Sequence, residues 1–243
     1  MEKLDSRLQN EIQHGKYLVE HGPGMLWGWE TPAGKERWAR RVAMLTSHIS
    51  SGMQVLEVGC GTGYFTKELA KTGALITAID ISRDLLEVAQ SEIKSKNVLF
   101  QIENAYALTF NDNYFDSIVG SSVLHHLEVD RALSEFYRVL KPGGSLYFTE
   151  PNMLNPQLLV QKNIPYIKRR MGESPDETAF FRWPLVKKIV RYGFKKVKAK
   201  PFDFLHPNIP KSSIPVIRTV GYILERMPLL CEIAGSLYIR AEK

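Results

Sequence analysis

The stretch Q-V-L-E-V-G-C-G-T-G-Y, residues 54–64, decides the fold of this chain. Its first half contains an apolar run at 55–58, which is typical of a strand buried on both faces. Three alternating glycines follow, and then Phe65 and Leu69 stand four residues apart, as on one face of a helix. Strand, glycine loop and helix in this order predict a nucleotide-like binding site at the carboxyl end of a parallel strand.

The loop differs from the two common phosphate-binding loops. Gly59, Gly61 and Gly63 follow a G-x-G-x-G spacing rather than G-x-G-x-x-G, and the loop contains no lysine, so neither a dinucleotide fingerprint nor a P-loop fits. We expect glycine here because a Cβ would keep the backbone away from a ligand and because tight turns need unusual φ/ψ. Glu57, directly before the loop, would repel a pyrophosphate and favour a ligand with net positive charge. S-adenosylmethionine (SAM), with a sulfonium and an ammonium against one carboxylate, is such a ligand.

Length and composition fit one large α/β domain or a core with a cap. The 243 residues suffice for a sizeable hydrophobic core, and 44% of them are hydrophobic. Cys60 and Cys231 form neither a disulfide framework nor a metal-ligand spacing, which favours a reducing compartment. No stretch is typical of a signal peptide or a spanning helix, so we expect a cytoplasmic protein.

The positive charge of the chain is concentrated in one segment. The net charge is +6, and residues 151–200 carry 12 Lys/Arg against 3 Asp/Glu, a balance of +9 that leaves −3 for the rest. Such a segment can face nucleic acid, an anionic membrane surface or an acidic substrate. A solvated, lysine-rich outer surface is the simpler interpretation.

The first 140 residues predict helices followed by βαβ units. Residues 1–50 are expected to form an N-terminal helical lid, broken at Gly22-Pro23-Gly24. Its tryptophans, Trp27, Trp29 and Trp38, are expected to seal an edge of the core, and contact with a substrate is the alternative. No proline occurs from 53 to 140, where apolar runs at 74–79, 98–102 and 115–120 alternate with helical patterns. One of these helices is expected to be capped by Asp130. The alternation predicts a mostly parallel sheet with helices on both faces, within a domain of residues 51–243.

The last 100 residues predict a more irregular arrangement. Eleven of the 13 prolines lie from Pro142 onward, and K-P-G-G at 141–144 is expected to turn the chain into a fifth strand at 145–149. Helical cap insertions are expected at about 152–180 and 202–234. Alternating patterns at 195–200 and 236–240 predict two late strands. The fold class is therefore a doubly wound α/β sheet, mostly parallel and seven-stranded, with an antiparallel C-terminal edge.

Four motifs in register carry a family resemblance. They are V-L-E-V-G-C-G-T-G, the acid Asp80 at the end of the second strand, F-D-S-I-V-G-S-S-V-L-H-H-L, and R-V-L-K-P-G-G-S-L. Together, over roughly residues 50–150, they resemble class I SAM-dependent methyltransferases, and most of all the small-molecule and lipid-methylating branch called type 11. The resemblance implies a Rossmann-like methyltransferase fold, SAM as cofactor and methyl transfer as the reaction.

The residues indicate how each part of SAM would be held. Asp80 lies 21 residues after Gly59, close to the ~20-residue interval at which an acid binds ribose hydroxyls. Ile81 would pack on the adenine face. Glu57 is expected to face the methionine ammonium, directly or through water, although a carboxylate that caps neighbouring backbone remains open. Cys60 is interpreted as a small packing residue of the loop rather than a nucleophile.

Further expected contacts come from the resemblance. Family members usually carry an aspartate where this chain has Asn104, but an amide can still accept from the adenine amino group and donate to the adjacent ring nitrogen. Ala105 would add a backbone contact. Gly120 and Ser121 would present backbone carbonyls to the ammonium.

The histidine pair is the candidate catalytic feature. His125 or His126 could deprotonate a hydroxyl near the methyl group, but V-L-H-H-L also occurs in the family with a structural or pocket-lining role. Both interpretations stay open. Because the sulfonium is already an activated donor, in-line alignment can supply most of the acceleration. No metal-ligand set is expected, since the other histidines are scattered, at His14, His21, His48 and His206.

Three functions remain as hypotheses. An apolar cap with a basic rim favours transfer to a hydrophobic or acidic small molecule, or to a lipid-like acceptor at a membrane surface. RNA methylation through the basic segment 151–200 is an alternative, weakened because the chain lacks an appended RNA-binding module and an N-P-P-Y-type signature. A non-catalytic SAM-binding module is the third. A dinucleotide-dependent oxidoreductase is disfavoured by the loop spacing and by Glu57.

Overall fold

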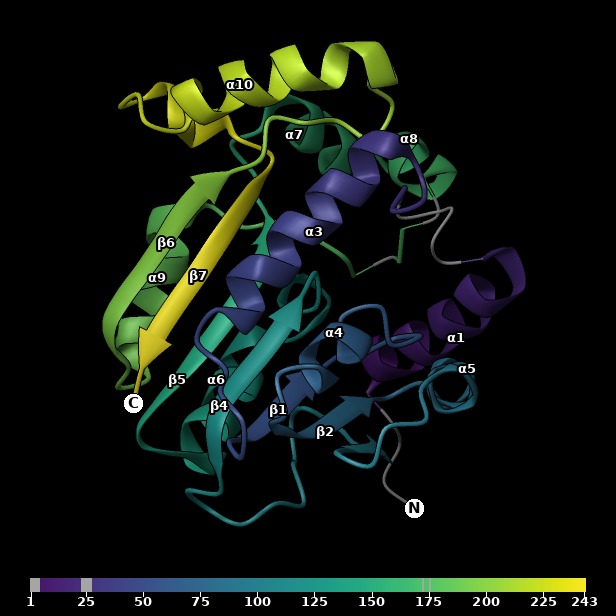
Figure 1. Ribbon diagram of the computed structural model, residues 1–243, viewed down its shortest axis with the longest axis vertical. Helices are drawn as coiled ribbons and strands as arrows, with labels where there is room; N and C mark the ends of the chain where they lie inside the picture. The colour runs from purple at the N-terminus through teal and green to yellow at the C-terminus, as the bar shows by residue number, and fades with distance from the viewer. Residues whose placement is uncertain (1–4, 23–27, 172, 175) are drawn as a thin grey trace.

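One mixed sheet forms the centre of the protein (Figure 1). The computed structural model describes residues 5–22, 28–171, 173–174 and 176–243. Within these residues the sheet has seven strands in the order β3-β2-β1-β4-β5-β7-β6. The strands are β1 Gln54–Val58, β2 Leu75–Asp80, β3 Val98–Ile102, β4 Phe115–Ser121, β5 Leu140–Pro151, β6 Lys195–Phe202 and β7 Ser236–Glu242.

The first five strands are parallel, which confirms the predicted βαβ organisation. β1 pairs with β2 on one side and with β4 on the other, so the strand order reverses between β1 and β4. In open α/β sheets ligands bind at this switch point, outside the carboxyl ends of the strands. The connecting helices are α4 Thr66–Ala70, α5 Arg83–Glu92 and α6 Val129–Val139. The fold therefore places the glycine loop at the position where ligands bind.

The last strand runs against the others. β7 lies between β5 and β6 and is antiparallel to both, so β6 at the sheet edge runs in the same direction as β5. This confirms the expected antiparallel C-terminal part and places its reversed strand inside the sheet rather than at its border. Because β7 is reversed, its first residue, Ser236, lies beside the last residue of β6, Phe202.

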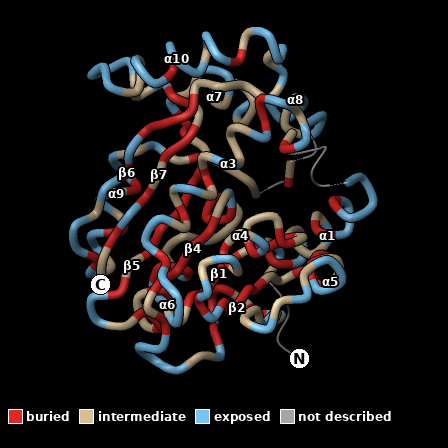
Figure 2. The backbone as a smooth tube through the Cα atoms, in the orientation of Figure 1, coloured by how far each residue is buried: buried red, intermediate tan, exposed pale blue. Residues whose placement is uncertain are grey.

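Two apolar clusters cover the two faces of the sheet. One contains Leu56, Ile118 and Phe148 together with Phe136 of α6. The other contains Val55 and Ile76 of the strands, packed against residues such as Leu45 and Leu69 from the helices on that face. Figure 2 shows the strands largely buried and the surrounding helices exposed on their outer sides. Burial on both faces explains why the inner strands β1 and β2 are largely continuous apolar runs, whereas the edge strand β6 alternates.

The N-terminal helices are present as expected. α1 spans Ser6–His21, α3 spans Pro32–Thr46, and the side chains of Asp5 and Thr31 cap them. α1 packs on α5, and α3 packs on α4, β4 and β5. Gly22 ends α1 with a φ of 75°, whereas Pro23, Gly24 and Trp27 of the expected break and tryptophan set lie outside the described residues.

The two expected insertions are helical. The first contains α7 Pro156–Asn163 and α8 Pro165–Arg170, and it is followed by α9 Arg182–Arg191. The second contains η2 Lys211–Ser213, α10 Ile214–Leu224 and η3 Leu230–Ile233. Figure 1 shows α7, α8 and α10 at one end of the molecule, beyond the carboxyl ends of β4 and β5.

Two local predictions were wrong. Asp130 does not cap a helix, because α6 begins at Val129 after Glu128, and the Asp130 carboxylate instead binds Lys188 and Tyr192 of the α9 region. The segment K-P-G-G does not separate α6 from the fifth strand. β5 starts already at Leu140, since Leu140 pairs with Phe115 of β4 and the sheet accommodates a register shift after it.

No helix in the described part of the chain is both long enough and apolar enough to cross a membrane.

Candidate active site

A cavity of about 390 Å³ opens at the switch point of the sheet. Its strand side, defined here by the lining residues of 58–61, 79–81, 105–106 and 121–123, comes from the strand ends and the loops that follow them. Its helix side, defined by the lining residues of 8–18, 29–41, 158–162 and 171–177, comes from α1, α3, α7 and the segment after α8. Residues 125–127 lie between the two sides.

The glycine loop is held by its own hydrogen bonds and packing. The Gly61 N–H donates to Asp80 Oδ2 at 2.9 Å, and the Cys60 N–H donates to the Ile79 carbonyl at 3.0 Å. Gly59 has a φ of 65°, and a Cβ there would lie 2.3 Å from Val123 Cγ2. A Cβ on Gly63 would lie 2.5 Å from Ile93 Cδ1. At these two positions glycine is therefore required by the protein's own packing, and Gly63 does not line the cavity.

Asp80 lies at the cavity, and both of its carboxylate oxygens accept hydrogen bonds. Oδ2 accepts from Gly61 and Oδ1 accepts from the Ser82 N–H, each at 2.9 Å. Burial raises the pKa of this carboxyl, and the two N–H donors partly offset the shift. Each oxygen retains a second lone pair for another donor. Asp80 is thus an oriented acceptor at the end of β2, and Ile81 lines the cavity next to it.

Glu57 lies behind the loop rather than on the cavity surface. Its side chain is buried on β1, it is absent from the cavity lining, and its Oε2 atom has no hydrogen-bond partner among the described residues. Burial raises the pKa of Glu57 to about 8, and the negative charge of Asp80 adds to the shift. A buried carboxylate with an unpaired oxygen is costly, and a cation bound at the loop would compensate its charge.

The remaining predicted contacts divide into two groups. Ala105 and Ser121 line the cavity. Asn104 does not, because its Oδ1 atom accepts from the Tyr106 N–H at 2.9 Å and closes the turn after β3. Gly120 also lies below the surface, where a Cβ would be 2.4 Å from Phe148 Cε1. Among these four positions, only Ala105 and Ser121 are brought to the cavity.

Cys60 lines the cavity as a thiol. Burial raises its pKa well above the usual value, and the nearby carboxylates of Asp80 and Glu57 add to the effect. A thiol that stays protonated is a poor nucleophile. The structure therefore gives no support for nucleophilic chemistry at this residue.

His125 is held between two carboxylates. Its Nδ1 atom is 2.7 Å from Glu150 Oε2, and its Nε2 atom is 3.3 Å from Glu177 Oε1. Although burial lowers the pKa of His125, these carboxylates outweigh it and raise the pKa to about 9. Glu150 also accepts from the N–H groups of Val123 and Leu124, at 3.0 and 2.9 Å, so it holds the turn after β4.

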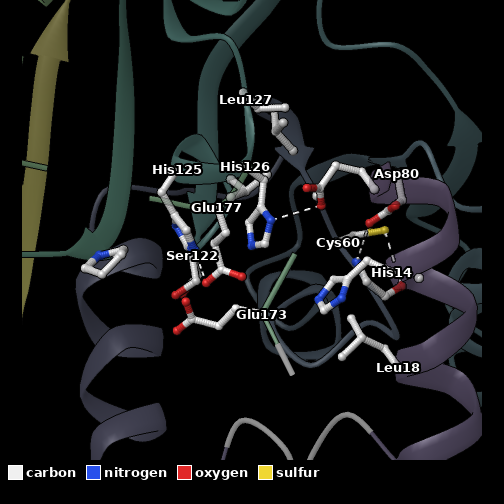
Figure 3. A pocket seen from close by; sticks show the side chains of 18 of the residues that line it. His14, Leu18, Cys60, Asp80, Ser122, His125, His126, Leu127, Glu173 and Glu177 are labelled. Atoms are coloured by element: carbon white, nitrogen blue, oxygen red, sulfur yellow. Dashed lines mark hydrogen bonds and ion pairs between the residues drawn. The ribbon is translucent and has the colours of Figure 1, made fainter. Parts of the chain in front are cut away.

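His126 faces the helix side of the cavity. Its Nδ1 atom lies 2.9 Å from Glu11 Oε2, and Glu11 also accepts from the Ser174 hydroxyl at 2.6 Å. His14 stacks on the His126 ring with the centroids 6.0 Å apart. Figure 3 shows Asp80 and Cys60 on one side of this group and His125, Glu173 and Glu177 on the other, with His126 between them.

The helix side also carries aromatic rings and arginines. Trp29 is nearly buried and meets Phe65 edge to face, with the centroids 6.3 Å apart. Arg37 and Arg41 lie over the Trp29 ring, at 5.6 and 5.3 Å from its centroid. Both arginines contact Asp203 at 2.8 Å, so one carboxylate compensates two guanidinium charges. The wall is therefore aromatic with a partly compensated positive charge.

Most of these helix-side residues were not predicted. Glu11, Arg41 and Glu177 come from segments outside the four motifs, and nothing in their spacing places them beside the glycine loop. A signal existed for one further residue, Glu150, because an acid at the end of the fifth strand reaches the same sheet edge as the histidine pair. His14, which is far from the histidine pair in the sequence, is brought beside His126 by the fold.

Comparison with known proteins identifies the family. The Methyltransf_11 family, described as a methyltransferase domain, matches residues 56–148. The chain is 30% identical over 191 residues to the demethylmenaquinone methyltransferase of Thermobifida fusca, covering 70% of this chain and 81% of that protein. It is 32% identical over 133 residues to the ubiquinone biosynthesis O-methyltransferase of Coxiella burnetii, where the match spans 51% of this chain and 57% of the relative.

Solved structures support the same fold. The N-methyltransferase NodS from Bradyrhizobium japonicum, in complex with S-adenosylhomocysteine (SAH), superposes with a TM-score of 0.65 at 18% identity, covering 96% of this chain and 98% of that chain. The protein belongs to the class I SAM-dependent methyltransferases. It is a methyltransferase of the type 11 branch, and SAM is its cofactor.

Proposed function

We propose that this enzyme transfers the methyl group of SAM to a small, largely apolar ring acceptor that carries oxygen, of the quinol type. The observation that carries the proposal is that a single cavity is lined by the glycine-loop strand side, by Trp29 of the helix side with Phe65 packed against it, and by the histidine–glutamate group. An aromatic wall favours binding of a flat apolar ring, and the histidine and glutamate side chains can form hydrogen bonds with the hydroxyl of the acceptor. The names of the two quinone-pathway relatives support the same acceptor class.

The strand side supplies the proposed cofactor contacts. Asp80, held by two N–H donors, would accept both ribose hydroxyls, and Ile81 would cover the adenine with Ala105 supplying a backbone contact. Glu57 would compensate the methionine ammonium from behind the loop, through water. Asn104 and Gly120 would act indirectly, by shaping the turn after β3 and the end of β4.

The protein has to align the acceptor with the methyl group and to remove one proton from the acceptor. SAM supplies an activated methyl group when it is bound, so the residues mainly orient the acceptor for in-line displacement. His125 is already protonated near neutral pH and cannot accept the proton, because both of its ring nitrogens face carboxylates that raise its pKa to about 9. His126, on the cavity surface beside Glu11, is the better proton acceptor as long as no other ligand occupies its ring nitrogens.

The N-terminal helices are proposed to act as a lid. α1 and α3 contribute Leu18, Arg37 and other residues to the helix side, so displacement of this segment would open the cavity. We retain residues 1–50 as the lid and 51–243 as the SAM-binding domain. The insertion at 152–180 lines the cavity, whereas no described residue of 202–234 does.

A lipid-like acceptor would be reached from a membrane surface on the cytoplasmic side. α10 and the turn after it expose Val216, Ile223 and Leu229, with exposed fractions of 65%, 54% and 83%. Arg226 and Lys211 lie beside them and are exposed. Exposed apolar side chains with basic neighbours favour binding in the interface of an anionic bilayer.

The experiment is methylation of reduced naphthoquinone acceptors with and without an isoprenoid chain. Purified enzyme is incubated with SAM and each acceptor, and SAH and methylated product are measured by mass spectrometry. Product from the quinols and none from bulk RNA supports the proposal. Methylation of RNA with no quinol product would favour the alternative that uses segment 151–200, and SAH-tight binding without turnover on either would favour a non-catalytic module.

A further inference from the structure

The histidine pair forms a group of metal-type ligands with a residue of the first insertion. One ring nitrogen each of His125 and His126 and a carboxylate oxygen of Glu177 lie within 4.8 Å of one another. They come from the turn after β4 and from the segment after α8, and Figure 3 shows their side chains converging at the cavity. All three line it, so an ion held by them would be open to the cavity.

The separation between His125 and Glu177 also matches that of two ligands of one ion. Charge-assisted N–H···O bonds are about 2.7–2.9 Å long, and His125 Nδ1 makes such a contact with Glu150 at 2.7 Å. The Nε2 atom of the same ring is 3.3 Å from Glu177 Oε1. Two ligand atoms about 2.0–2.1 Å from a tetrahedral zinc ion lie about 3.3–3.4 Å apart, which matches this distance.

The outer contacts of the histidines are those of metal ligands. A ligating histidine usually presents its second nitrogen to a carboxylate, which fixes the ring and raises its basicity. Glu150 does this for His125 Nδ1, and it is itself fixed by two backbone N–H groups. Glu11 lies 2.9 Å from His126 Nδ1 and accepts from Ser174. The His125 ring is thus positioned from behind, with its Nε2 atom directed at Glu177, whereas His126 Nδ1 makes an ion-pair contact with Glu11 and no hydrogen bond among the described residues.

The side chains around His125, His126 and Glu177 carry an excess of negative charge that a cation would compensate. Among the described residues, Glu11, Glu150, Glu173 and Glu177 surround the two imidazoles, whereas Lys162 is the ammonium that contacts Glu173 and Glu177. These four carboxylates outnumber the two ammonium groups at Glu177, those of Lys162 and Lys168, and metal binding would displace the proton that His125 otherwise holds. Buried charges of one sign need compensation, and a divalent cation would supply it.

We propose that His125, His126 and Glu177 bind a divalent transition-metal ion of the zinc type. Two imidazoles and one carboxylate suit zinc, and three protein ligands leave a coordination position open, as in catalytic rather than structural zinc sites. That position faces the cavity. With the ion bound, His126 is a ligand and not a base, and the ion would take over the activation of the acceptor oxygen by lowering the pKa of its hydroxyl. Ion binding stands by itself, whereas this role rests on the proposed function.

The test uses metal-stripped, full-length enzyme and Co²⁺ as a spectroscopic substitute for Zn²⁺. We expect one equivalent of Co²⁺ to give visible d–d absorption of a low-coordinate nitrogen–oxygen site, and Zn²⁺ to displace it. Glu177→Gln and His126→Ala should each weaken Zn²⁺ binding at least tenfold. His14→Ala is the matched control, because His14 lies in the same cavity and outside the three ligands, and it should bind Zn²⁺ like the wild type.

Binding of SAH, followed by calorimetry, shows that each variant is folded. No spectral change with the stripped wild type, or equal losses in His14→Ala and Glu177→Gln, would overturn the site. Stoichiometric Zn²⁺ binding without methylation of any quinol would contradict only the proposed function. Methylation that persists in the stripped enzyme, together with absent metal binding, would contradict only the metal.

A second variant tests the place of the ion. Lys162 contacts Glu177, so its ammonium competes with a cation at the same carboxylate. Lys162→Met should tighten Zn²⁺ binding about tenfold, because it removes one positive charge next to the ligand. Unchanged or weaker Zn²⁺ binding in this variant would contradict the placement of the ion beside Glu177.

Discussion

The two sides of the cavity are built in different ways. The strand side is made of consecutive segments that the sheet aligns, and its polar contacts use backbone N–H groups, as at Gly61 and Ser82. The helix side is formed by residues of α1, α3, α7 and the segment after α8. Ion pairs between side chains, such as Arg41 with Asp203, stabilise it. Enzymes that share a cofactor need the same backbone arrangement around it. Their specificity for the acceptor can change by substitution of side chains on separate helices.

The largest expected effect is on the helix side. Arg41 is buried, contacts Asp203 at 2.8 Å and donates to Ser236 Oγ at 2.6 Å. Removing one partner of a buried pair leaves an uncompensated charge, so Asp203→Asn, which removes the carboxylate that both Arg41 and Arg37 contact, should lower the free energy of unfolding by about 3–5 kcal/mol. Urea denaturation measures this. The control is Arg218→Met, whose pair with Glu36 is exposed and should cost under about 1 kcal/mol. Equal losses would mean that the helix side is not held by buried charge.

The next effect concerns Glu57 on the strand side and depends on pH. Its folded-state pKa of about 8 lies above the unfolded value of 4.5, so the folded state holds a proton in between and stability falls as pH rises from 4.5 toward 8. Glu57→Gln has no such proton. The free energy of unfolding of Glu57→Gln, relative to that of the wild type, should therefore increase by about 4 kcal/mol between pH 5 and pH 8, at about 1.4 kcal/mol per pH unit.

Thermal unfolding of the ligand-free proteins across this pH range measures the difference. A difference between Glu57→Gln and the wild type that does not change with pH would show that the Glu57 carboxyl titrates normally. Glu57→Gln should also bind SAH more weakly, which separates a ligand role from a purely structural one.

Asp80 gives the largest expected effect on cofactor affinity. Hydrogen bonds to a charged group contribute about 1.5–3 kcal/mol each, so Asp80→Ala should weaken SAH binding at least about 100-fold. Asp80→Asn keeps one oxygen for the backbone N–H of Gly61 or Ser82 and should lose less. Calorimetry compares the two. If His126→Ala weakened SAH binding and Asp80→Ala did not, the cofactor would be assigned to the helix side and not to the strand side.

The smallest of these effects separates packing from ligand contact in the glycine loop. Gly59→Ala brings a Cβ to 2.3 Å from Val123 Cγ2 at a φ of 65°, so it should destabilise the protein by about 2–3 kcal/mol. Gly52→Ala is the control, with a φ of 82° and no atom within 4 Å, and should cost about 1 kcal/mol. The double variant Gly59→Ala, Val123→Ala should recover part of the loss. Equal costs at the two glycines would mean that Val123 moves aside.

Sequence patterns predicted the strand side because it is local. The apolar runs of β1 to β4, the glycine loop and Asp80 are each readable within a few residues, and the sheet topology then brings their ends together. The helix side is not local. Glu11 and Glu177 meet the histidine pair only because α1 and the first insertion fold over the cavity, and no periodicity records such contacts.

The errors on single residues have the same cause. Asp130 fits a capping pattern, but the nearby Lys188 and Tyr192 of a later segment give its carboxylate stronger partners. For two of the expected contact residues the structure shows only their place relative to the cavity: Glu57 is buried on β1, and Asn104 accepts a hydrogen bond from Tyr106, so neither lines the cavity. Spacing shows which side chains are near a site, whereas the orientation of each depends on neighbours from elsewhere in the chain.

The reversed strand β7 makes the second insertion an oversized hairpin loop. The chain leaves the sheet at Phe202 and re-enters it at Ser236, and these two residues are paired neighbours. The Gly235 N–H donates to the Asp203 carbonyl at 2.7 Å and closes the neck. Closing a longer loop costs only slightly more entropy, so segments of very different length can occupy this place. The length and the exposed surface of this outermost helical segment can therefore change while the cavity stays the same.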